Sequence, residues 1–354
     1  MVGISLLTLV PGEVGGSETY ARGLCRGLAE VGTLEYTVFT PPAAPGAGEG
    51  LREVPVPEYR VARSMPERAL AMALAAARPG RIRRRFEDVD VLHYALTVAV
   101  PKVDAPSIVT LFDLQHLDLP DLFSHAERAY RRFAYEGSAR NADVVVVNSQ
   151  FVRRGVIERL GVPPERIHTI PLGIDHGRFT PGDEEREPVL LYPARPWPHK
   201  NHERLFEAFA LLRQERPELE LVLTGGGHEG RPVPTGVVVR GNVSGEELVS
   251  LYRRAACMVF PSLYEGFGQP PLEAMACGCP VAASNIPAIA EACGDAAALF
   301  DPNDPEDIAA VVAGVLDAPD RFAAGGLARA RAFTWPETAR RHEDVYRLVG
   351  QLIG

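Results

Sequence analysis

The sequence predicts an α/β chain with two doubly wound, Rossmann-like domains that face a central cleft. Its 354 residues exceed what one ordinary core holds, and at roughly 150 residues per domain the length suggests two domains. Short apolar runs rich in β-branched residues alternate with helical patterns, which is typical of parallel sheets covered by helices on both faces. The alternation stops at about 176–188, a stretch rich in Pro, Gly and charge, and then begins again.

The N-terminal half opens with an apolar run at residues 4–10, which we expect to be a strand, followed by a helix over 17–31. Further apolar runs predict the other strands of the first sheet. They lie at residues 36–40, 89–96, 106–113 and 142–149.

The C-terminal half repeats this pattern and predicts a second sheet of the same kind. Its strands are expected at residues 188–195, 219–227, 236–243, 256–262 and 279–284, and its helices at about 201–215, 245–255 and 271–277. The last twenty or so residues predict an amphipathic helix with Val345, Leu348 and Val349 on one side.

The composition argues against several classes of protein. The net charge of -9 at pH 7 opposes the positive surface that a general nucleic-acid binder needs. No apolar stretch approaches the roughly 20 residues of a membrane-spanning helix, and the first ten residues resemble a strand rather than a signal peptide, so we expect a cytoplasmic protein. Five cysteines, an odd number in a long chain, fit neither a disulfide scaffold nor a zinc site.

Eight arginines lie between Arg60 and Arg85, in a segment rich in Ala, Leu and Met. An amphipathic helix there would meet an acidic acceptor or an anionic membrane face, which would make the protein peripheral to the inner membrane face. A solvated helix face explains the same pattern and is the commoner outcome.

Only two of the 37 Lys and Arg residues are lysines, Lys102 and Lys200. Lys102 follows a proline in a predicted loop, where a charge is usually exposed. Lys200 and Arg195 instead flank a rigid Pro-Trp-Pro segment after a predicted strand. Two cations at this spacing can converge on one diphosphate and stabilise the charge that develops as it leaves, although isolated surface charges give the same pattern.

The strongest local pattern is a Gly-rich turn between a strand that ends at Pro261 and a helix that begins near residue 270. Prolines are tolerated at that helix start because the first helical N–H groups lack partners. The backbone amides of Gly266, Phe267 and Gly268, together with the positive end of the helix, predict a site for an anion or for sugar hydroxyls.

Two carboxylates, Glu265 and Glu273, bracket this turn. Glu273 lies about one helical turn inside the helix, so both side chains can face the same cleft, one to hold a transferred sugar and the other a ribose. The alternative is an ordinary strand-to-helix connection with a capping glutamate and a surface glutamate.

Glycines end two other predicted strands. Gly225 lies in a Thr-Gly-Gly-Gly turn and Gly16 in the first strand-to-helix turn, and both allow close backbone approach by a ligand. Glycine turns also serve packing alone. The P-loop pattern GxxxxGK[ST] does not occur, which weakens a P-loop ATPase as an interpretation.

Two patterns suggest a metal only superficially. Asp88-Val89-Asp90 precedes a predicted strand rather than ending one, which favours a structural role. His199 and His202 flank Lys200 without a nearby carboxylate cluster, as a loop residue and a helix-start residue would. We therefore expect no metal site.

Taken together, these residues resemble the retaining glycosyltransferases of family 4, which have the two-domain GT-B fold. The similarity extends over nearly the whole chain and is densest at residues 195–201, 241–243 and 265–278. Glu265 and Glu273 match the family's pair of glutamates separated by seven residues, a fairly specific motif in this setting.

The resemblance implies roles for the matched positions of the C-terminal half. Glu273 would bind the ribose of a nucleotide-sugar donor, and Glu265 would contact the donor sugar. Arg195 and Lys200 would grip the diphosphate.

The resemblance also implies that the backbone of Asn242 and Val243 meets the base and that Gly16 approaches the diphosphate from the other domain. Members of this type need no metal, and the nucleotide sugar is a co-substrate rather than a cofactor. Their C-terminal helix crosses back onto the N-terminal domain.

One position departs from the family pattern. Many members carry a His-Asp pair after the strand that here covers 106–113, whereas this chain has Phe112-Asp113. A histidine appears only at His116. Either His116 reaches the cleft and takes the catalytic part of the missing histidine, or it is a loop residue.

We therefore predict a retaining hexosyltransferase that moves a hexose from a nucleotide-diphosphate sugar to a hydroxyl acceptor, which is a glycan, a lipid-linked glycan or a secondary metabolite. Residues 1–175 would bind the acceptor, 176–335 the donor, and 336–354 would form the helix that crosses back. The alternatives are a nucleotide-sugar epimerase or sugar phosphorylase on the same scaffold, and a non-catalytic nucleotide-sugar-binding protein.

Overall fold

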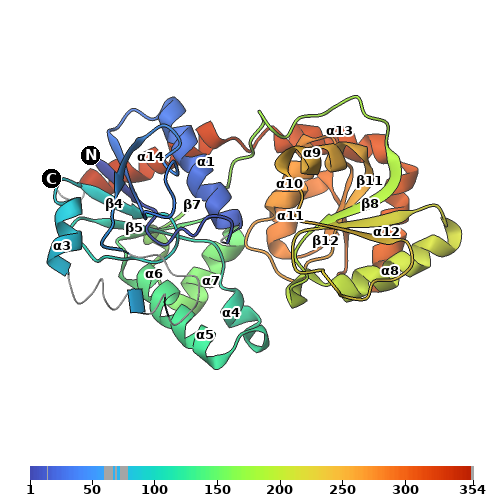
Figure 1. Cartoon of the computed structure of the whole chain (residues 1–354), viewed down its shortest axis with the longest axis horizontal. Coiled ribbons are helices and arrows are strands. Elements are labelled where there is room, and N and C mark those ends of the chain that lie inside the picture. Colours follow the sequence, from blue (N-terminus) through green and yellow to red (C-terminus); the bar gives the residue numbers. More distant parts are fainter. Residues whose placement is uncertain (14, 60–66, 68–69, 72–78, 352–354) are drawn as a thin grey trace. The chain divides into compact units, whose positions relative to one another are not determined.

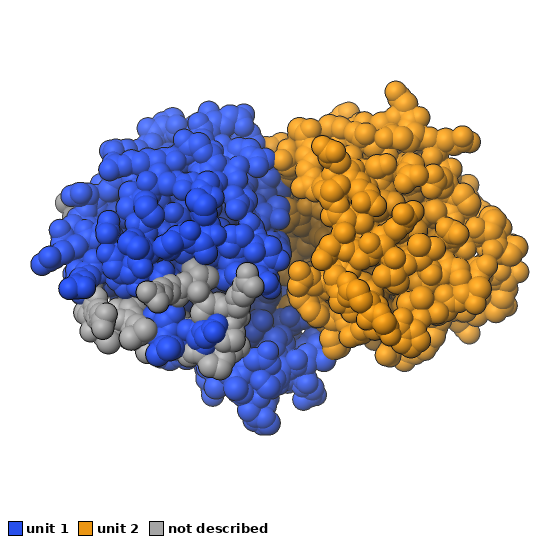
Figure 2. All heavy atoms as spheres, in the orientation of Figure 1, with its two compact units in different colours: residues 1–173, 335–354 blue, residues 174–334 orange. Residues whose placement is uncertain are grey.

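The computed structural model describes residues 1–13, 15–59, 67, 70–71 and 79–351 and divides the chain into two compact units (Figure 1). Unit 1 comprises residues 1–173 and 335–354, and unit 2 comprises residues 174–334 (Figure 2). Each unit contains one parallel sheet with helices packed against it, which confirms the predicted fold class. Within the part of the chain described here, no helix is both long and apolar enough to span a membrane.

Unit 1 contains a seven-stranded sheet in the order β3-β2-β1-β4-β5-β6-β7, in which all neighbours are parallel. The order reverses between β1 and β4, and ligands of open α/β sheets bind outside the carboxyl ends of strands at such a reversal. The strands are β1 (Val2–Ser5), β2 (Tyr36–Thr40), β3 (Arg52–Pro55), β4 (Val91–Tyr94), β5 (Ser107–Leu111), β6 (Val144–Val147) and β7 (Ile167–Thr169).

Local signals set the ends of the unit 1 helices. Ser149 accepts the N–H of Val152 at the start of α7, and Gly161, with φ of +67°, ends that helix. The helices are α1 (Gly16–Val31), α3 (Pro79–Arg83), α4 (Gln115–Asp118), α5 (His125–Arg131), α6 (Gly137–Asn141), α7 (Gln150–Leu160) and α14 (Trp335–Gln351). A π-helical turn covers Arg132–Glu136, and 3-10 turns cover Arg84–Phe86, Pro120–Leu122 and Pro164–Arg166.

Unit 2 contains a six-stranded parallel sheet in the order β10-β9-β8-β11-β12-β13. Its strands are β8 (Glu187–Pro193), β9 (Glu220–Thr224), β10 (Val237–Gly241), β11 (Ala255–Phe260), β12 (Val281–Ser284) and β13 (Ala298–Phe300). Its helices are α8 (His202–Glu215), α9 (Gly245–Arg254), α10 (Gln269–Ala276), α11 (Pro287–Cys293), α12 (Pro305–Asp317) and α13 (Pro319–Ala330), with 3-10 turns at Pro198–Lys200 and Gly294–Ala296. Helix α12 packs against α8, and α10 packs against α9, α11 and α13.

A chain of buried polar side chains fixes α14 in unit 1, where it packs along α1. The Tyr20 hydroxyl lies 2.8 Å from both Thr110 Oγ1 and His342 Nε2. His93 Nε2 lies 2.8 Å from the same Thr110 oxygen, and His93 Nδ1 lies 2.8 Å from the Tyr346 hydroxyl. Two of these five residues belong to α14, and the others come from α1, β4 and β5.

The donor and the acceptor of each hydrogen bond in this network can be assigned by starting from His342. The Thr338 carbonyl only accepts, so His342 Nδ1, at 2.8 Å, donates to it and a neutral His342 accepts at Nε2 from Tyr20. Each hydroxyl has one hydrogen, so Thr110 must donate to Tyr20, His93 Nε2 to Thr110, and Tyr346 to His93 Nδ1. These donor and acceptor roles describe the network with both histidines neutral.

The predicted apolar side of the last helix is partly wrong. Val345 and Val349 are buried as expected, but Leu348 is 43% exposed. The buried face of α14 is centred on the polar side chains of Thr338 and His342, both nearly inaccessible, and Leu348 points away from it. Hydrophobic periodicity misplaced this face because hydrogen bonds cover part of it.

The arginine-rich segment of residues 60–85 lies largely outside the described residues. At its described end, Arg83 Nε donates to the Lys102 carbonyl at 2.8 Å and Arg85 pairs with Glu58 at 2.9 Å. The predicted contact with a membrane or an acidic acceptor therefore stays a prediction.

Acid should destabilise unit 1 through its two buried histidines. Burial lowers the pKa of His342 from 6.5 to about 4 and that of His93 well below its usual value. Between the unfolded-state pKa and the lower folded-state pKa of a histidine, the unfolded state binds a proton that the folded state does not. Each of the two histidines therefore lowers the free energy of unfolding by about 1.4 kcal/mol for every pH unit that the pH falls in this range. Stability is complete above pH 6.5 and lost progressively toward pH 4.

Urea unfolding at several pH values, followed by tryptophan fluorescence, measures this effect. The chain has two tryptophans, so a Trp197→Phe background leaves Trp335 as a fluorescent reporter of unit 1. His342→Gln should remove the contribution of His342 to the pH dependence of the free energy of unfolding. His125→Gln, at an exposed position, should not. An unaltered slope in His342→Gln would contradict the neutral chain.

Candidate active site

The candidate site of unit 2 lies where its strand order reverses, between β8 and β11. Both strands run in the same direction, so the loops that follow them, residues 194–201 and 261–268, leave the same edge of the sheet. This edge is where open parallel sheets bind ligands. The sequence-predicted residues Lys200 and Glu265 lie in these two loops.

The structure brings Lys200 and Glu265 into direct contact. Lys200 Nζ lies 2.5 Å from Glu265 Oε1, and the two side chains are only 13% and 15% exposed. The ammonium also lies 5.2 Å from the centre of the Phe260 ring, at the end of β11. An acid and a base from two different strand ends thus form one partly buried ion pair.

Asn201 and Tyr192 fix the backbone around this pair. Asn201 has left-handed backbone angles, φ 59° and ψ 40°, and its Nδ2 donates to the carbonyls of Pro261 at 3.1 Å and Pro302 at 2.7 Å. The Tyr192 hydroxyl donates to the Lys200 carbonyl at 2.7 Å. Because Pro261 and Pro302 follow β11 and β13, the Asn201 side chain joins the ends of three strands.

The Gly-rich turn leads into α10 as predicted from its glycines and prolines. Gly268 precedes the helix with φ of +113°, and a Cβ there would lie 2.6 Å from Ile289 Cδ1, so the position requires glycine. The Phe267 side chain is buried against Phe333, with ring centres 5.8 Å apart. The turn can therefore offer the backbone, rather than the side chain, of Gly266 to Gly268 to a ligand.

Glu273, on α10, is partly buried. Burial raises the pKa of Glu273 to about 7, while the positive charge of Arg178 lowers it and the negative charge of Asp175 raises it further. The carboxyl is therefore near half ionisation at neutral pH. Arg178 comes from the segment that the sequence predicted only as a linker, so this charge was missed.

Gly225, Gly226 and Gly241 form a glycine cluster at the ends of β9 and β10, beside the loop that follows β8. Gly225 has φ of +106°, its N–H donates to the Gly241 carbonyl at 2.7 Å, and a Cβ there would lie 3.1 Å from the Ala194 carbonyl carbon. A Cβ on Gly226 would lie 3.0 Å from Asn242 Nδ2. The structure thus brings Gly225 beside the loop after β8 and Asn242 beside Gly226, while Val243 is partly buried.

Residues 225–230 also spell G-x-G-x-x-G, a dinucleotide-binding pattern when it opens a helix. Here the glycines follow β9 and lead through a loop to β10, so the helix that would receive a pyrophosphate is not part of this turn. The spacing therefore does not support a dehydrogenase.

Arg195 lies exposed at the end of β8, with its guanidinium carbon 5.8 Å from the centre of the Trp197 ring. Trp197 is itself 51% exposed and stacks on His199, with ring centres 5.8 Å apart. The predicted convergence of Arg195 and Lys200 on one diphosphate stays a prediction.

The candidate positions in unit 1 follow β1 and β5. Gly16 begins α1, is exposed, and would carry a Cβ into open space. His116 is 2% exposed, and its Nε2 lies 3.2 Å from Glu136 Oε1, while Glu136 Oε2 pairs with Arg140 at 3.0 Å. Phe112 packs edge-on against Tyr20, with ring centres 5.0 Å apart.

The environment of His116 was not predicted. Burial lowers the pKa of His116, and its hydrogen bond to Glu136 opposes that shift. Its Nδ1 has no hydrogen-bond partner within the described residues. Glu136 ends the π-helical turn, a rare element that is frequent at functional sites and has no simple sequence signature.

The two metal-like patterns lie in different units. The Asp90 backbone N–H donates to the Met1 carbonyl beside β1, and His202 packs edge-on against His228 at the start of α8, with ring centres 5.0 Å apart. Over the residues that can be described, no group of three or more His, Cys, Asp or Glu side chains is arranged to hold a metal ion.

Two family models match adjacent parts of the chain. Residues 174–325 match the family described as glycosyl transferases group 1, and residues 14–178 match the family described as glycosyltransferase family 4. Together the two matches span residues 14–325, which include most of both units.

Several curated proteins are similar to this chain over most of its length. It is 30% identical over 285 residues to the O-antigen chain mannosyltransferase B of Escherichia coli, covering 73% of this chain and 75% of that protein. It is 31% identical over 390 residues to the D-inositol 3-phosphate glycosyltransferase 2 of Catenulispora acidiphila, covering 95% and 90%.

Solved structures share the fold. The sucrose-phosphate synthase of Thermosynechococcus elongatus aligns with a TM-score of 0.80 at 21% identity over 98% of both chains. HepE of Anabaena, solved with UDP-glucose, aligns with a TM-score of 0.72 at 17% identity over 98% of this chain and 99% of that one. With matching family models for both units and relatives at 30% identity or more, this chain belongs to family 4 of the glycosyltransferases, which transfer a sugar from a nucleotide sugar, and has their GT-B fold.

Proposed function

We propose that this chain transfers a hexose, with retention, from a nucleotide-diphosphate sugar to a hydroxyl acceptor, and that the reaction needs no metal. The observation that carries the proposal is the Lys200–Glu265 ion pair of 2.5 Å at the reversal of the unit 2 sheet. It places a fixed cation and a fixed carboxylate together at the strand edge where a ligand of this fold is expected.

Lys200 would hold the diphosphate and stabilise its charge as it leaves. An ammonium has three N–H donors, and the pairing with Glu265 uses one of them, so donors remain for phosphate oxygens. Arg195, at the same strand end, would add a second cation. Charge stabilisation by fixed groups at a leaving group is commonly the largest single contribution to a rate enhancement.

Glu265 and the turn after it would hold the donor sugar. The Glu265 carboxylate would accept sugar hydroxyls, and the backbone amides of Gly266 to Gly268, at the start of α10, would donate to sugar or phosphate oxygens. The acceptor hydroxyl would attack on the face from which the diphosphate leaves, which gives retention.

Glu273 and the glycine cluster would bind the nucleoside. Glu273 would accept hydrogen bonds from the ribose hydroxyls, and the backbone of Asn242 and Val243 would meet the base beside Gly225. In unit 1, Gly16 would approach the diphosphate. The names of the relatives cover a polymer, the O-antigen chain, and a small molecule, D-inositol 3-phosphate, so a glycan, a lipid-linked glycan and a secondary metabolite all stay candidate acceptors.

A thermal-shift screen against UDP-, GDP-, dTDP- and ADP-sugars, followed by transfer assays with the donor that binds, tests this function. Bound donor raises the unfolding temperature by mass action. The substrates required distinguish a transferase from the two alternative enzymes, because an epimerase converts the donor without an acceptor and a phosphorylase requires phosphate. Failure of every donor to stabilise the protein would contradict the proposal.

A second candidate function, non-catalytic binding of a nucleotide sugar, is favoured by one observation. His116 is buried against Glu136, and Phe112 stands where many family members have a histidine. If His116 does take part in transfer, His116→Ala should reduce turnover. An intact donor after long incubation with a broad acceptor panel, despite measurable binding, would support the binding protein instead.

Lys200→Ala should reduce kcat by about 10²–10³-fold, the usual effect of removing one fixed group that stabilises a leaving charge. The unfolding temperature should change far less. The other lysine of the chain supplies the control, because Lys102→Ala removes an ammonium from unit 1 and should leave kcat unchanged. Transfer by Lys200→Ala at the parent's rate would refute the assignment.

Donor binding should weaken as the pH falls through the pKa of Glu273, which is about 7. Only the ionised carboxylate accepts hydrogen bonds from both ribose hydroxyls, so below this pKa affinity should fall by up to about tenfold per pH unit. Calorimetric titration with the donor from pH 6 to 8.5 measures the effect. Glu273→Gln should bind more weakly at pH 8 with little pH dependence, whereas Glu207→Gln, on the exposed face of α8, should behave as the parent.

A further inference from the structure

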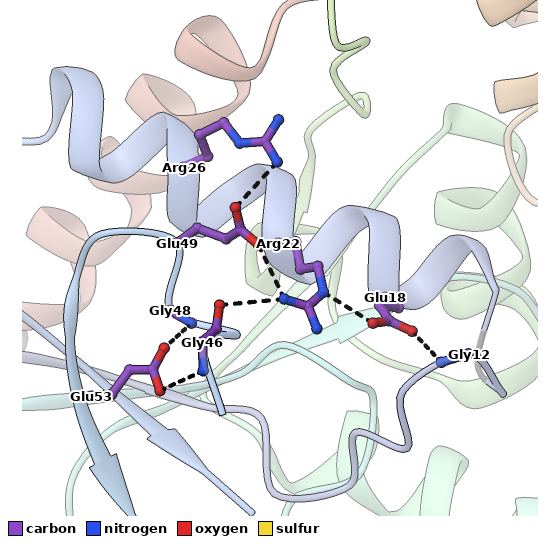
Figure 3. A network of polar contacts seen from close by, with 8 residues as sticks. All are labelled: Gly12, Glu18, Arg22, Arg26, Gly46, Gly48, Glu49 and Glu53. Carbon is purple, nitrogen blue, oxygen red and sulfur yellow. Dashed lines mark hydrogen bonds and ion pairs between the residues drawn. The ribbon is translucent and has the colours of Figure 1, made fainter. Parts of the chain in front are cut away.

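A cluster of charged side chains lies beside the turn that precedes α1 (Figure 3). We call it the α1 charge cluster, and its members are Glu18, Arg22, Arg26, Glu49 and Glu53. Arg22 is at its centre: its Nε donates to Glu18 Oε1 at 2.9 Å, and its Nη1 donates to Glu49 Oε1 at 3.1 Å. The proposed function does not use any of these side chains.

The cluster connects α1 to the loops that follow β1 and β2. The second oxygen of Glu18 accepts the N–H of Gly12 at 2.8 Å, which ties the turn after β1 to the helix. Arg22 Nη1 also donates to the Gly46 carbonyl at 3.3 Å, and Glu53 accepts the Gly46 N–H at 3.1 Å. Arg22 therefore joins the carboxylate that holds one loop to the backbone of the next.

The turn held by Glu18 is open to a ligand. Gly12 and Gly15 have φ of +77° and +53°, and a Cβ on Gly12, Gly15 or Gly16 would meet no atom within 4 Å. The turn follows β1, whose neighbour β4 marks the reversal of the unit 1 sheet. This is the position at which the proposed function brings Gly16 to the diphosphate.

Glu18 creates an electrostatic problem for that ligand. It lies in the first turn of α1, where the partial positive charge of the helix end attracts an anion, and its carboxylate competes with a phosphate for the same potential. Its side chain is only 17% exposed, so water screens the charge poorly. A phosphate can approach at low cost only if a cation such as Arg22 neutralises the Glu18 charge.

We propose that Arg22 is a positioning residue for donor binding: it holds the Glu18 carboxylate on the Gly12 amide and cancels its charge, so that the turn at Gly12, Gly15 and Gly16 accepts a phosphate of the donor. The inference rests on the proposed function. Arg22 acts through Glu18 and does not itself touch the ligand.

Calorimetric titration of the full chain with UDP and with GDP tests the inference on binding alone. In Arg22→Gln the Glu18 carboxylate loses its counter-charge, so the dissociation constant of the nucleotide that binds the parent should rise roughly tenfold. Raising the salt concentration from about 0.05 M to about 0.5 M should narrow the difference from the parent, because the repulsion is screened.

A double variant separates charge from shape. In Glu18→Gln with Arg22→Gln, the amide oxygen of residue 18 can still accept the Gly12 N–H, residue 18 no longer carries a charge, and Glu49 keeps its ion pair with Arg26. Its dissociation constant should return to within about threefold of the parent's, which a purely structural role for the ion pair would not produce.

Arg341→Gln is the matched control. Arg341 Nε lies 2.8 Å from Glu337 Oε1 on α14, with the same atoms and the same spacing of four residues as Arg22 and Glu18. Its loss should leave nucleotide binding unchanged.

Equal binding by Arg22→Gln and the parent would overturn the inference, as would a double variant that binds no better than Arg22→Gln. These outcomes are distinct from a failure of the proposed function. A parent protein that binds a nucleoside diphosphate but never transfers a sugar would end the proposed function and leave the test of Arg22 in place.

Discussion

The side-chain amide of Asn201 holds together the part of unit 2 on which the candidate site depends. Both of its N–H groups are used, one on the carbonyl after β11 and one on the carbonyl after β13. The left-handed backbone at this position is tolerated by asparagine better than by most residues. Lys200 comes immediately before it, with its own carbonyl held by Tyr192, so the ammonium reaches Glu265 from a fixed backbone. The charged pair is thus positioned by neutral hydrogen bonds to strand ends.

Unit 1 uses a different kind of constraint. Its C-terminal helix is held by a directed chain of neutral hydrogen bonds through Tyr20, Thr110, His93 and His342, all of them buried. Burial lowers the pKa of both histidines, so a further proton on this network is disfavoured. The two units therefore use different constraints: the Lys200 ammonium has three N–H donors and its bond to Glu265 uses one of them, whereas the network of unit 1 is buried.

Much of the fold could be predicted from the sequence, because its signals are local. Residues 144–147 are four successive valines, which are typical of a strand buried on both faces, and the prolines and glycines of 266–271 indicate the start of α10 directly. Contacts between distant residues have no such signal. The proximity of Arg178 to Glu273, and of Glu136 to His116, follows from the packing of separate elements. Leu348 was misplaced for the related reason that polar residues occupy the buried face of its helix.

The division of the chain has a consequence for how the protein is made. Unit 2 is one continuous segment, whereas unit 1 is completed by residues 335–351, which pack along α1 only after unit 2 has been synthesised. The ends of unit 2 meet at a backbone bridge between Ile174 and Thr334, so this segment can fold as a closed insert while the nascent chain emerges. Until then the surfaces of Tyr20 and His93 that α14 covers stay uncovered on the ribosome. Unit 1, which contains the N-terminal residues, is therefore the last unit to be completed during synthesis.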